Sequence, residues 1–143
     1  MSELPRMHTT EHILNAVMQR DFGTGRSVGA HFSPKKSKCD YAISRPITAE
    51  DLPKIQASVN AEIQADHLVT TFEISREKAD ASYNMGKVPD SATTIRIVKI
   101  GDLDVIPCVG QHVEHTAQIG RFVLRSADMK DESTVRIRFA LEQ

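Results

Sequence analysis

The sequence has 143 residues, enough for one domain with a hydrophobic core and too few for two. Apolar residues make up 40% and charged residues 26%, values of an ordinary folded protein, so the composition excludes an intrinsically disordered chain. A formal net charge of −1 excludes a protein that coats nucleic acid through its overall charge. We therefore expect a single domain over residues 1–143.

Signals for membranes or secretion are not visible in the sequence. No apolar run approaches the roughly 20 residues that a membrane span needs, and the first residues, MSELPRMHTTEH, are too polar for a signal peptide. Two cysteines, Cys39 and Cys108, are too few for a disulfide scaffold. These observations predict a cytoplasmic protein without a membrane partner, in which Cys39 belongs to the core.

Hydrophobic periodicity predicts the secondary structure in chain order. Apolar residues recur at helical spacing in the segments of residues 9–20, 48–66 and 76–85. They alternate as in strands in residues 27–33, 38–44, 68–74, 93–100, 103–106, 119–125 and 133–141. A turn is expected at residues 34–36. In residues 68–74 the alternation of Leu68, Thr70, Phe72 and Ile74 predicts a strand with one buried face.

The last predicted strand shows the alternation most clearly. Ile137 and Phe139 point to one face, and Arg136 and Arg138 point to the other. Helices packed on one side of a mostly antiparallel sheet account for this order of elements, so the predicted fold class is α+β.

A pair of histidines lies at the start of the first predicted helix. His8 and His12 are four residues apart, so a helix places both imidazoles on one face, where they can reach a common point. Neutral imidazoles at this spacing suit zinc. Taken alone, the pair fits two exposed histidines on an ordinary helix better than a metal site.

A second pair, Cys108 and His112, has the same four-residue spacing. A buried structural cysteine is the commoner role of a lone cysteine in a cytoplasmic protein. Pro107 and Gly110, however, indicate a tight turn that presents ligands. Both pairs together offer three histidines and one cysteine, a ligand set that fits zinc.

The same residues permit a different enzyme class. The sequence HTTEH at residues 8–12 also matches the HxxEH pattern of inverted zinc peptidases, in which Glu11 would be the general base. Those enzymes need a further acidic ligand and a larger cleft. This interpretation leaves Cys108 and His112 unexplained, so we rank it behind the others.

A family resemblance rests on three motifs. Residues 108–120, CVGQHVEHTAQIG, resemble the signature CGGTHVxxTGEIG of the editing domain shared by threonyl- and alanyl-tRNA synthetases. Residues 8–14, HTTEHIL, are similar to the HTAxHLL helix of this family, and residues 135–141, VRIRFAL, to its closing RRIRIAL-like strand. Free-standing trans-editing proteins of the AlaX type share the domain. The likeness spans nearly the whole chain.

The departures from the signature also carry information. Val109 and Gln111 replace a glycine and the threonine of CGGTH. Ile106 stands where the threonyl type carries an acid, which favours the alanyl type.

The resemblance implies hydrolysis of the ester that joins a wrongly attached amino acid to tRNA, most simply serine or glycine in the alanine system. It implies an editing-domain-like two-layer sandwich and Zn²⁺ bound by the two histidine and cysteine pairs. The implied metal ligands are His8, His12, Cys108 and His112. No residue is assigned a catalytic role. The polar residues expected to bind the substrate are Thr9, His31, Gln111 and Thr116.

The implied partner is the aminoacylated 3′ end of tRNA, with neither DNA nor membrane. Residues 26–45 hold five basic residues against one acid, a local net charge of +4, which suits phosphate contacts. The residues expected to contact tRNA are Lys35, Lys36, Lys38, Arg136 and Arg138. The alternative from another class is a zinc-structured module that binds an amino acid or an RNA end without hydrolysis. The changes at Val109 and Gln111 make this alternative credible.

Overall fold

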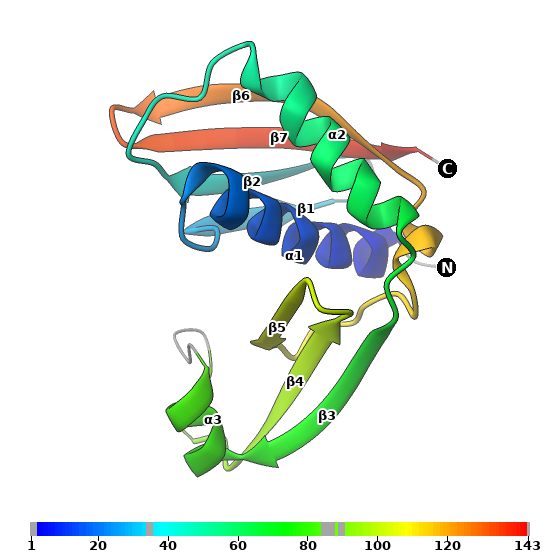
Figure 1. Ribbon diagram of the computed structural model, residues 1–143. Helices are drawn as coiled ribbons and strands as arrows, with labels where there is room; N and C mark the ends of the chain where they lie inside the picture. Colours follow the sequence, from blue (N-terminus) through cyan, green and yellow to red (C-terminus); the bar gives the residue numbers. More distant parts are fainter. Residues whose placement is uncertain (1–2, 34–35, 84–87, 89–90, 143) are drawn as a thin grey trace.

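The computed structural model describes residues 3–33, 36–83, 88 and 91–142, and in these residues the chain forms two antiparallel sheets (Figure 1). The strand order is β1-β2-β7-β6 in the larger sheet and β3-β4-β5 in the smaller one. The strands are β1 (Gly29–Phe32), β2 (Ser37–Ala42), β3 (Val69–Ser75), β4 (Thr94–Ile100), β5 (Asp104–Pro107), β6 (Arg121–Asp131) and β7 (Thr134–Glu142). The helices are α1 (Glu3–Phe22), α2 (Asp51–Gln64), α3 (Arg76–Ser82) and the short 3-10 helix η1 (Thr116–Ile119).

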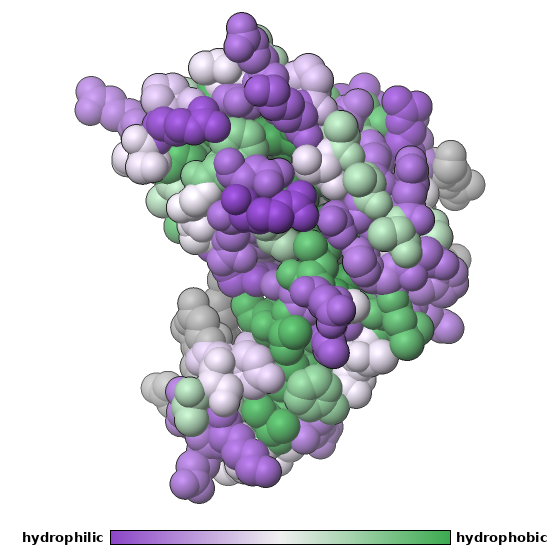
Figure 2. Space-filling view, viewed as in Figure 1, coloured by the Kyte–Doolittle hydropathy of each residue, from purple (hydrophilic) through white to green (hydrophobic). Residues whose placement is uncertain are grey.

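Helices α1 and α2 pack on one face of the four-stranded sheet, so the predicted α+β fold with helices on one side is confirmed (Figure 1). The smaller sheet lies on the other side of α1. Residues 9–18 are consequently all buried, although only one face of this segment has the apolar stripe. Polar side chains of α1 therefore face an interior between the helix and the second sheet. Figure 2 shows apolar side chains gathered at the waist between the two parts of the molecule.

The main core lies between the helices and the large sheet. Phe122 of β6 and Phe139 of β7 are fully buried, with their ring centroids 5.2 Å apart. Ile137 is also buried, whereas Arg136 and Arg138 point away from the core, which confirms the predicted alternation in the last strand. Cys39 is a fully buried core residue, as the sequence predicts.

Helix α1 begins six residues before the predicted start at residue 9. In the added turns, the Arg6 side chain donates a hydrogen bond of 2.9 Å to the carbonyl oxygen of Ile119 and another of 3.5 Å to that of Glu142. These partners are more than 100 residues away in the sequence, so local periodicity carries no sign of them. Within the described ranges, no helix is both long and apolar enough to cross a membrane.

The prediction of a buried face on the strand at residues 68–74 is wrong. Leu68 is 63% exposed and Phe72 is 40% exposed. The reason is that neither core covers these two side chains, whereas Ile74 at the other end of β3 is half-buried against the second cluster of Ala79, Ile95 and Ile97. Helix α3 ends at Ser82, and the remainder of the predicted helix at residues 83–85 falls largely outside the described residues, as do Pro34 and Lys35 of the predicted turn.

Candidate metal centre

Four side chains from two distant parts of the sequence meet beside α1. His8 and His12 lie one turn apart on the helix, and Cys108 and His112 lie in the loop after β5. Their candidate ligand atoms all lie within 4.8 Å of one another. Cys108 Sγ is 3.3 Å from His8 Nε2, and the rings of His8 and His112 stack with centroids 4.3 Å apart. The two sequence pairs therefore form one cluster.

Arg96 of β4 shapes the loop that carries Cys108. Its Nη1 atom donates hydrogen bonds of 3.0 and 2.8 Å to the carbonyl oxygens of Cys108 and Gly110, and the Cys108 amide donates to the Arg96 carbonyl oxygen. Gly110 lies directly against the His8 ring, where any Cβ atom would overlap the imidazole. A glycine is thus required for the loop to approach the helix this closely.

Thr9 fixes the orientation of His112. The Thr9 hydroxyl donates a hydrogen bond of 2.7 Å to the carbonyl oxygen of Pro5 and accepts one from the Val113 amide. Because its single proton is used, its 3.2 Å contact with His112 Nδ1 requires the imidazole to be the donor. The proton of neutral His112 is therefore on Nδ1. Its Nε2 atom is buried and makes no hydrogen bond within the described structure, as expected for an atom that binds a metal.

Asp104 performs the same task for His12. Its Oδ2 atom is 3.0 Å from His12 Nδ1, and a carboxylate can only accept, so Nε2 of a neutral His12 is left for the metal. Arg26 donates hydrogen bonds of 2.8 and 3.1 Å to the two oxygens of Asp104. Burial opposes ionisation of Asp104, but the hydrogen bonds from His12 and Arg26 hold the pKa of this carboxyl below its usual value.

Two of the four groups, Cys108 and His112, favour the charge state that a metal ion requires. Burial opposes ionisation of Cys108, but the neighbouring imidazoles of His112, His12 and His8 lower the pKa of this thiol to about 3. Burial lowers the pKa of His112, which favours the neutral imidazole. Burial opposes protonation of His12, but its hydrogen bonds to Asp104 and Cys108 raise the pKa of this imidazole. One thiolate and three imidazoles form a nitrogen and sulfur ligand set that fits zinc.

Replacing Asp104 with asparagine is expected to weaken zinc affinity by about tenfold to a hundredfold, because outer partners of metal-binding histidines have effects of this size. The asparagine keeps the shape but loses the charge that holds both His12 and Arg26. Competition with a chromophoric chelator measures the affinity. Asp102→Asn, at an exposed position two residues earlier, is the matched control. Equal affinity of Asp104→Asn and the unmodified protein would show that Asp104 does not support the site.

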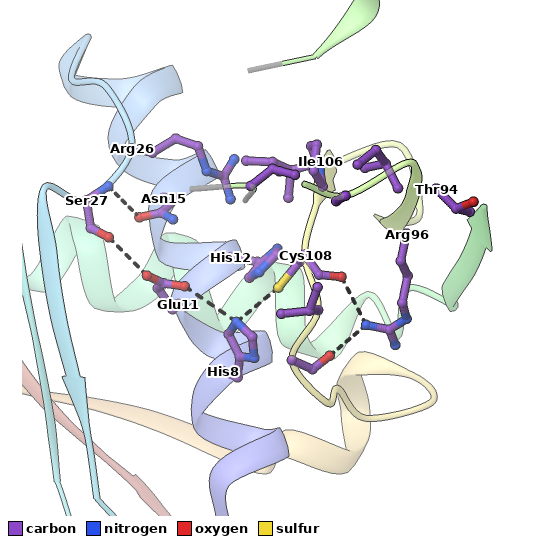
Figure 3. A pocket seen from close by; sticks show the side chains of 16 residues that line it. His8, Glu11, His12, Asn15, Arg26, Ser27, Thr94, Arg96, Ile106 and Cys108 are labelled. Atoms are coloured by element: carbon purple, nitrogen blue, oxygen red, sulfur yellow. Dashed lines mark hydrogen bonds and ion pairs between the residues drawn. The ribbon is translucent and has the colours of Figure 1, made fainter. Parts of the chain in front are cut away.

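A cavity of about 840 Å³ lies next to the cluster (Figure 3). His8, His12 and Glu11 of α1 line its polar wall, and apolar residues such as Ile95 and Ile106 from the smaller sheet line the other. This volume is within the range of pockets that bind small molecules and cofactors. The candidate metal ligands therefore lie at the edge of a space that can hold a ligand larger than an amino acid.

Residues 95–138 match the family described as the threonyl and alanyl tRNA synthetase second additional domain. This range runs from β4 into β7 and includes the loop with Cys108 and His112. Over these residues the chain is similar to this family.

The chain is similar to alanine–tRNA ligases of several organisms. It is 31% identical over 139 residues to that of Metallosphaera sedula, covering 94% of this chain and 15% of the ligase. It is 30% identical over 141 residues to that of Ignicoccus hospitalis, covering 95% of this chain and 16% of the ligase. It is 30% identical over 139 residues to that of Aeropyrum pernix. The chain thus spans about one sixth of the length of these relatives.

The structure separates the four residues expected to bind the substrate. Thr9 contacts the candidate metal ligand His112, as described above. Gln111 is exposed, and neither Gln111 nor His31 lines the cavity beside the cluster. Thr116 is buried away from the cavity, where its hydroxyl donates to the Ile63 carbonyl oxygen and accepts from the His67 amide. Asp104 and Arg26 were missed, because no sequence pattern marks a carboxylate that supports a metal ligand.

Replacing Thr116 with valine is expected to lower the free energy of unfolding by about 1–3 kcal/mol, because the isosteric change leaves the His67 amide without its acceptor. Urea denaturation measures the loss. Thr71→Val, at an exposed position in β3, is the control. A change in substrate KM without a loss of stability would instead favour a direct contact between Thr116 and the substrate.

The residues expected to contact tRNA fall into two groups. Lys36, Lys38 and Arg138 line a depression of about 180 Å³ on the large sheet, together with His31, which was expected to bind the substrate. Phe32 lies 5.8 Å from the His8 ring between centroids, and the side chain of its neighbour His31 points to the opposite face of the sheet. The basic depression therefore lies on the face of the large sheet that is turned away from α1.

Arg136 forms the second group, because its guanidinium group is paired with an acid of the same chain. Arg136 donates hydrogen bonds of 2.9 and 3.1 Å to the two oxygens of Asp40. Arg138 also contacts an acid, Asp128, at 2.8 Å, but this pair is exposed. Lys35 lies outside the described residues.

Proposed function

We propose that this chain is an aminoacyl-tRNA deacylase that hydrolyses mischarged Ser-tRNA or Gly-tRNA of the alanine system. One observation carries the proposal: four metal ligands converge at the edge of a cavity of about 840 Å³, which is large enough for an amino acid joined to a nucleoside. Similarity to alanine–tRNA ligases over 94–95% of the chain supports the alanine system. We further propose that residues 1–143 form a single editing domain that acts in trans in the cytoplasm.

The proposed metal is Zn²⁺, held by His8, His12, Cys108 and His112. When bound, zinc supplies a positive charge that can polarise a water molecule or an ester carbonyl, or that orders the pocket. The chain prepares the ligands beforehand, since Asp104 and Thr9 orient His12 and His112. The ester bond is labile, so the placement of water and substrate supplies much of the required acceleration.

Selection of the amino acid is proposed to take place at the polar wall formed by α1. A small hydroxylated side chain fits a pocket whose buried polar groups need hydrogen-bond partners. Serine is therefore the first candidate and glycine the second. The basic depression around His31, Lys36 and Lys38 is proposed to contact phosphates of the tRNA acceptor end.

The alternative is a zinc-structured module that binds without hydrolysis. It rests on the changes at Val109 and Gln111 in the signature motif. Val109 is 88% exposed and Gln111 is exposed, so these changes leave the ligand cluster intact, as both candidate functions require. The HxxEH peptidase interpretation ranks third, because the ligand cluster contains no carboxylate and Glu11 accepts a hydrogen bond from Ser27.

Deacylation of a panel of charged tRNAs tests the proposal. The panel holds Ser-tRNAAla, Gly-tRNAAla and Ser-tRNAThr, with Ala-tRNAAla and Thr-tRNAThr as cognate controls, and zinc is quantified in the same sample. Selective hydrolysis of one mischarged species by protein with about one zinc per chain is expected. A folded, zinc-loaded protein that hydrolyses none of them would support the binding module.

A further inference from the structure

Glu11 has a buried carboxylate in the wall of the cavity, and this carboxylate makes no hydrogen bond to the four candidate metal ligands. The residue is 7% exposed, and it lines the cavity beside the candidate metal ligands (Figure 3). The Oε2 atom accepts a hydrogen bond of 2.9 Å from the Ser27 hydroxyl. The Oε1 atom lies 4.0 Å from His8 Nε2, beyond hydrogen-bond distance, and makes no other polar contact within the described residues. One oxygen of this carboxylate is therefore free to bind a ligand.

A chain of buried hydrogen bonds holds Glu11 in this position. Asn15 Oδ1 accepts from the hydroxyl of the fully buried Tyr41 at 2.6 Å and from the Ser27 amide at 3.2 Å. Ser27, fixed in this way, holds Glu11 through its own hydroxyl. The carboxylate is thus preorganised at the pocket wall, which lowers the entropic cost of binding a ligand.

Within the part of the chain that the structure describes, the charges around the pocket leave Glu11 without a cationic partner. Arg26 forms its bidentate pair with Asp104, and Arg96 donates to two backbone carbonyl oxygens. As a metal ligand, His8 contributes a neutral imidazole. A buried carboxylate without a counter-charge is unfavourable, so a ligand that brings a positive charge is favoured at this place.

We propose that Glu11 binds the α-ammonium group of the aminoacyl ester, and that the site therefore selects esters with a free α-amino group. This inference rests on the proposed function. In an aminoacyl ester the ammonium is one carbon away from the ester carbonyl. In the protein, Glu11 is one helical turn away from the ligand His8. The carboxylate can hold the ammonium while the ester stays beside the metal ligands. N-blocked and α-hydroxy esters lack the positive charge and bind less well.

The proposal is tested with two esters that differ only at the α-position, Ser-tRNAAla and its α-hydroxy counterpart, the glyceric acid ester glyceroyl-tRNAAla. Each enzymatic rate is divided by the uncatalysed rate of the same ester. The unmodified protein is expected to favour the seryl ester by about tenfold or more, the effect of a charge-assisted hydrogen bond. Glu11→Gln should lose this preference, because its kcat/KM should fall for the seryl ester and stay unchanged for the α-hydroxy ester. Glu132→Gln, at an exposed turn, should keep it.

Two kinetic results would overturn the proposal. An equal loss for both esters in Glu11→Gln would assign Glu11 to proton transfer or to the structure of the pocket. An unchanged preference in this variant would remove Glu11 from recognition. Zinc content and far-ultraviolet circular dichroism of the variant confirm that the comparison is made on folded, loaded protein.

A binding measurement separates this inference from the proposed function. Two non-hydrolysable amides are titrated by calorimetry into zinc-loaded protein. They are the amide of serine with 3′-amino-3′-deoxyadenosine and the corresponding glyceroyl amide. If neither ester is hydrolysed, the proposed function fails. The role of Glu11 is still supported if the unmodified protein binds the seryl amide about tenfold more tightly, Glu11→Gln loses this preference and Glu11→Asp partly restores it. Equal affinities for both amides, or binding of neither, in the unmodified protein overturn the inference without any variant.

Discussion

Replacing Cys108 with alanine is expected to remove the bound zinc and to lower kcat/KM for mischarged tRNA by more than about 100-fold. The reason is that outer partners of metal ligands alone account for tenfold to hundredfold effects, and Cys108 is a ligand itself. It also supplies the negative charge of the cluster, because the three neighbouring imidazoles lower the pKa of its thiol to about 3. Zinc content by mass spectrometry and deacylation of Ser-tRNAAla measure the two losses on one sample.

The second cysteine provides the matched control for this variant. Cys39 is fully buried in β2 and takes no part in the cluster, so Cys39→Ala is expected to keep zinc and activity with some loss of stability. A Cys108→Ala protein that deacylates as fast as the unmodified protein would show that the assigned site is wrong.

Replacing Gly110 with alanine is expected to weaken zinc binding by about 100-fold, although no ligand is removed. A Cβ atom at this position overlaps the His8 ring, so either the loop with Cys108 or the imidazole has to move. Arg96 donates a hydrogen bond of 2.8 Å to the Gly110 carbonyl oxygen, and this bond opposes movement of the loop away from His8. Overpacking of this kind destabilises a protein by roughly 1–3 kcal/mol. Displacement of a ligand lowers the zinc affinity further.

Zinc titration and thermal denaturation of the metal-free and zinc-loaded forms measure this effect. Gly25→Ala is the control, since a Cβ atom there meets no neighbour within 4 Å and its φ angle is not in the left-handed region. Gly110→Ala with full zinc affinity would mean that the loop and His8 are farther apart in solution.

The ligand set could be predicted from the sequence because each of its halves is local. His8 and His12 share one face of a helix, and Cys108 and His112 share one loop, so spacing alone brings each pair together. That the two pairs meet rested on the family resemblance, and the structure brings them within 4.8 Å. The α+β class was likewise predictable from the order of the elements.

The supporting residues could not be predicted in this way. Asp104 reaches His12 across 92 residues, and the bond between Thr9 and His112 spans 103 residues. Such contacts follow from the tertiary arrangement of α1 against the second sheet, which hydrophobic periodicity does not encode. The exposure of Phe72 was missed for the same reason, because alternation shows that a strand has two faces but not whether another layer covers one of them.

The dependence of deacylation on zinc tests the central claim most directly. Metal-free protein is titrated with zinc while hydrolysis of Ser-tRNAAla and the zinc content are followed together. We predict negligible activity without metal and a linear rise that ends at about one zinc per chain, as expected for a single four-ligand site. Deacylation by the metal-free protein at the rate of the zinc-loaded protein would contradict the claim that this cluster serves the reaction.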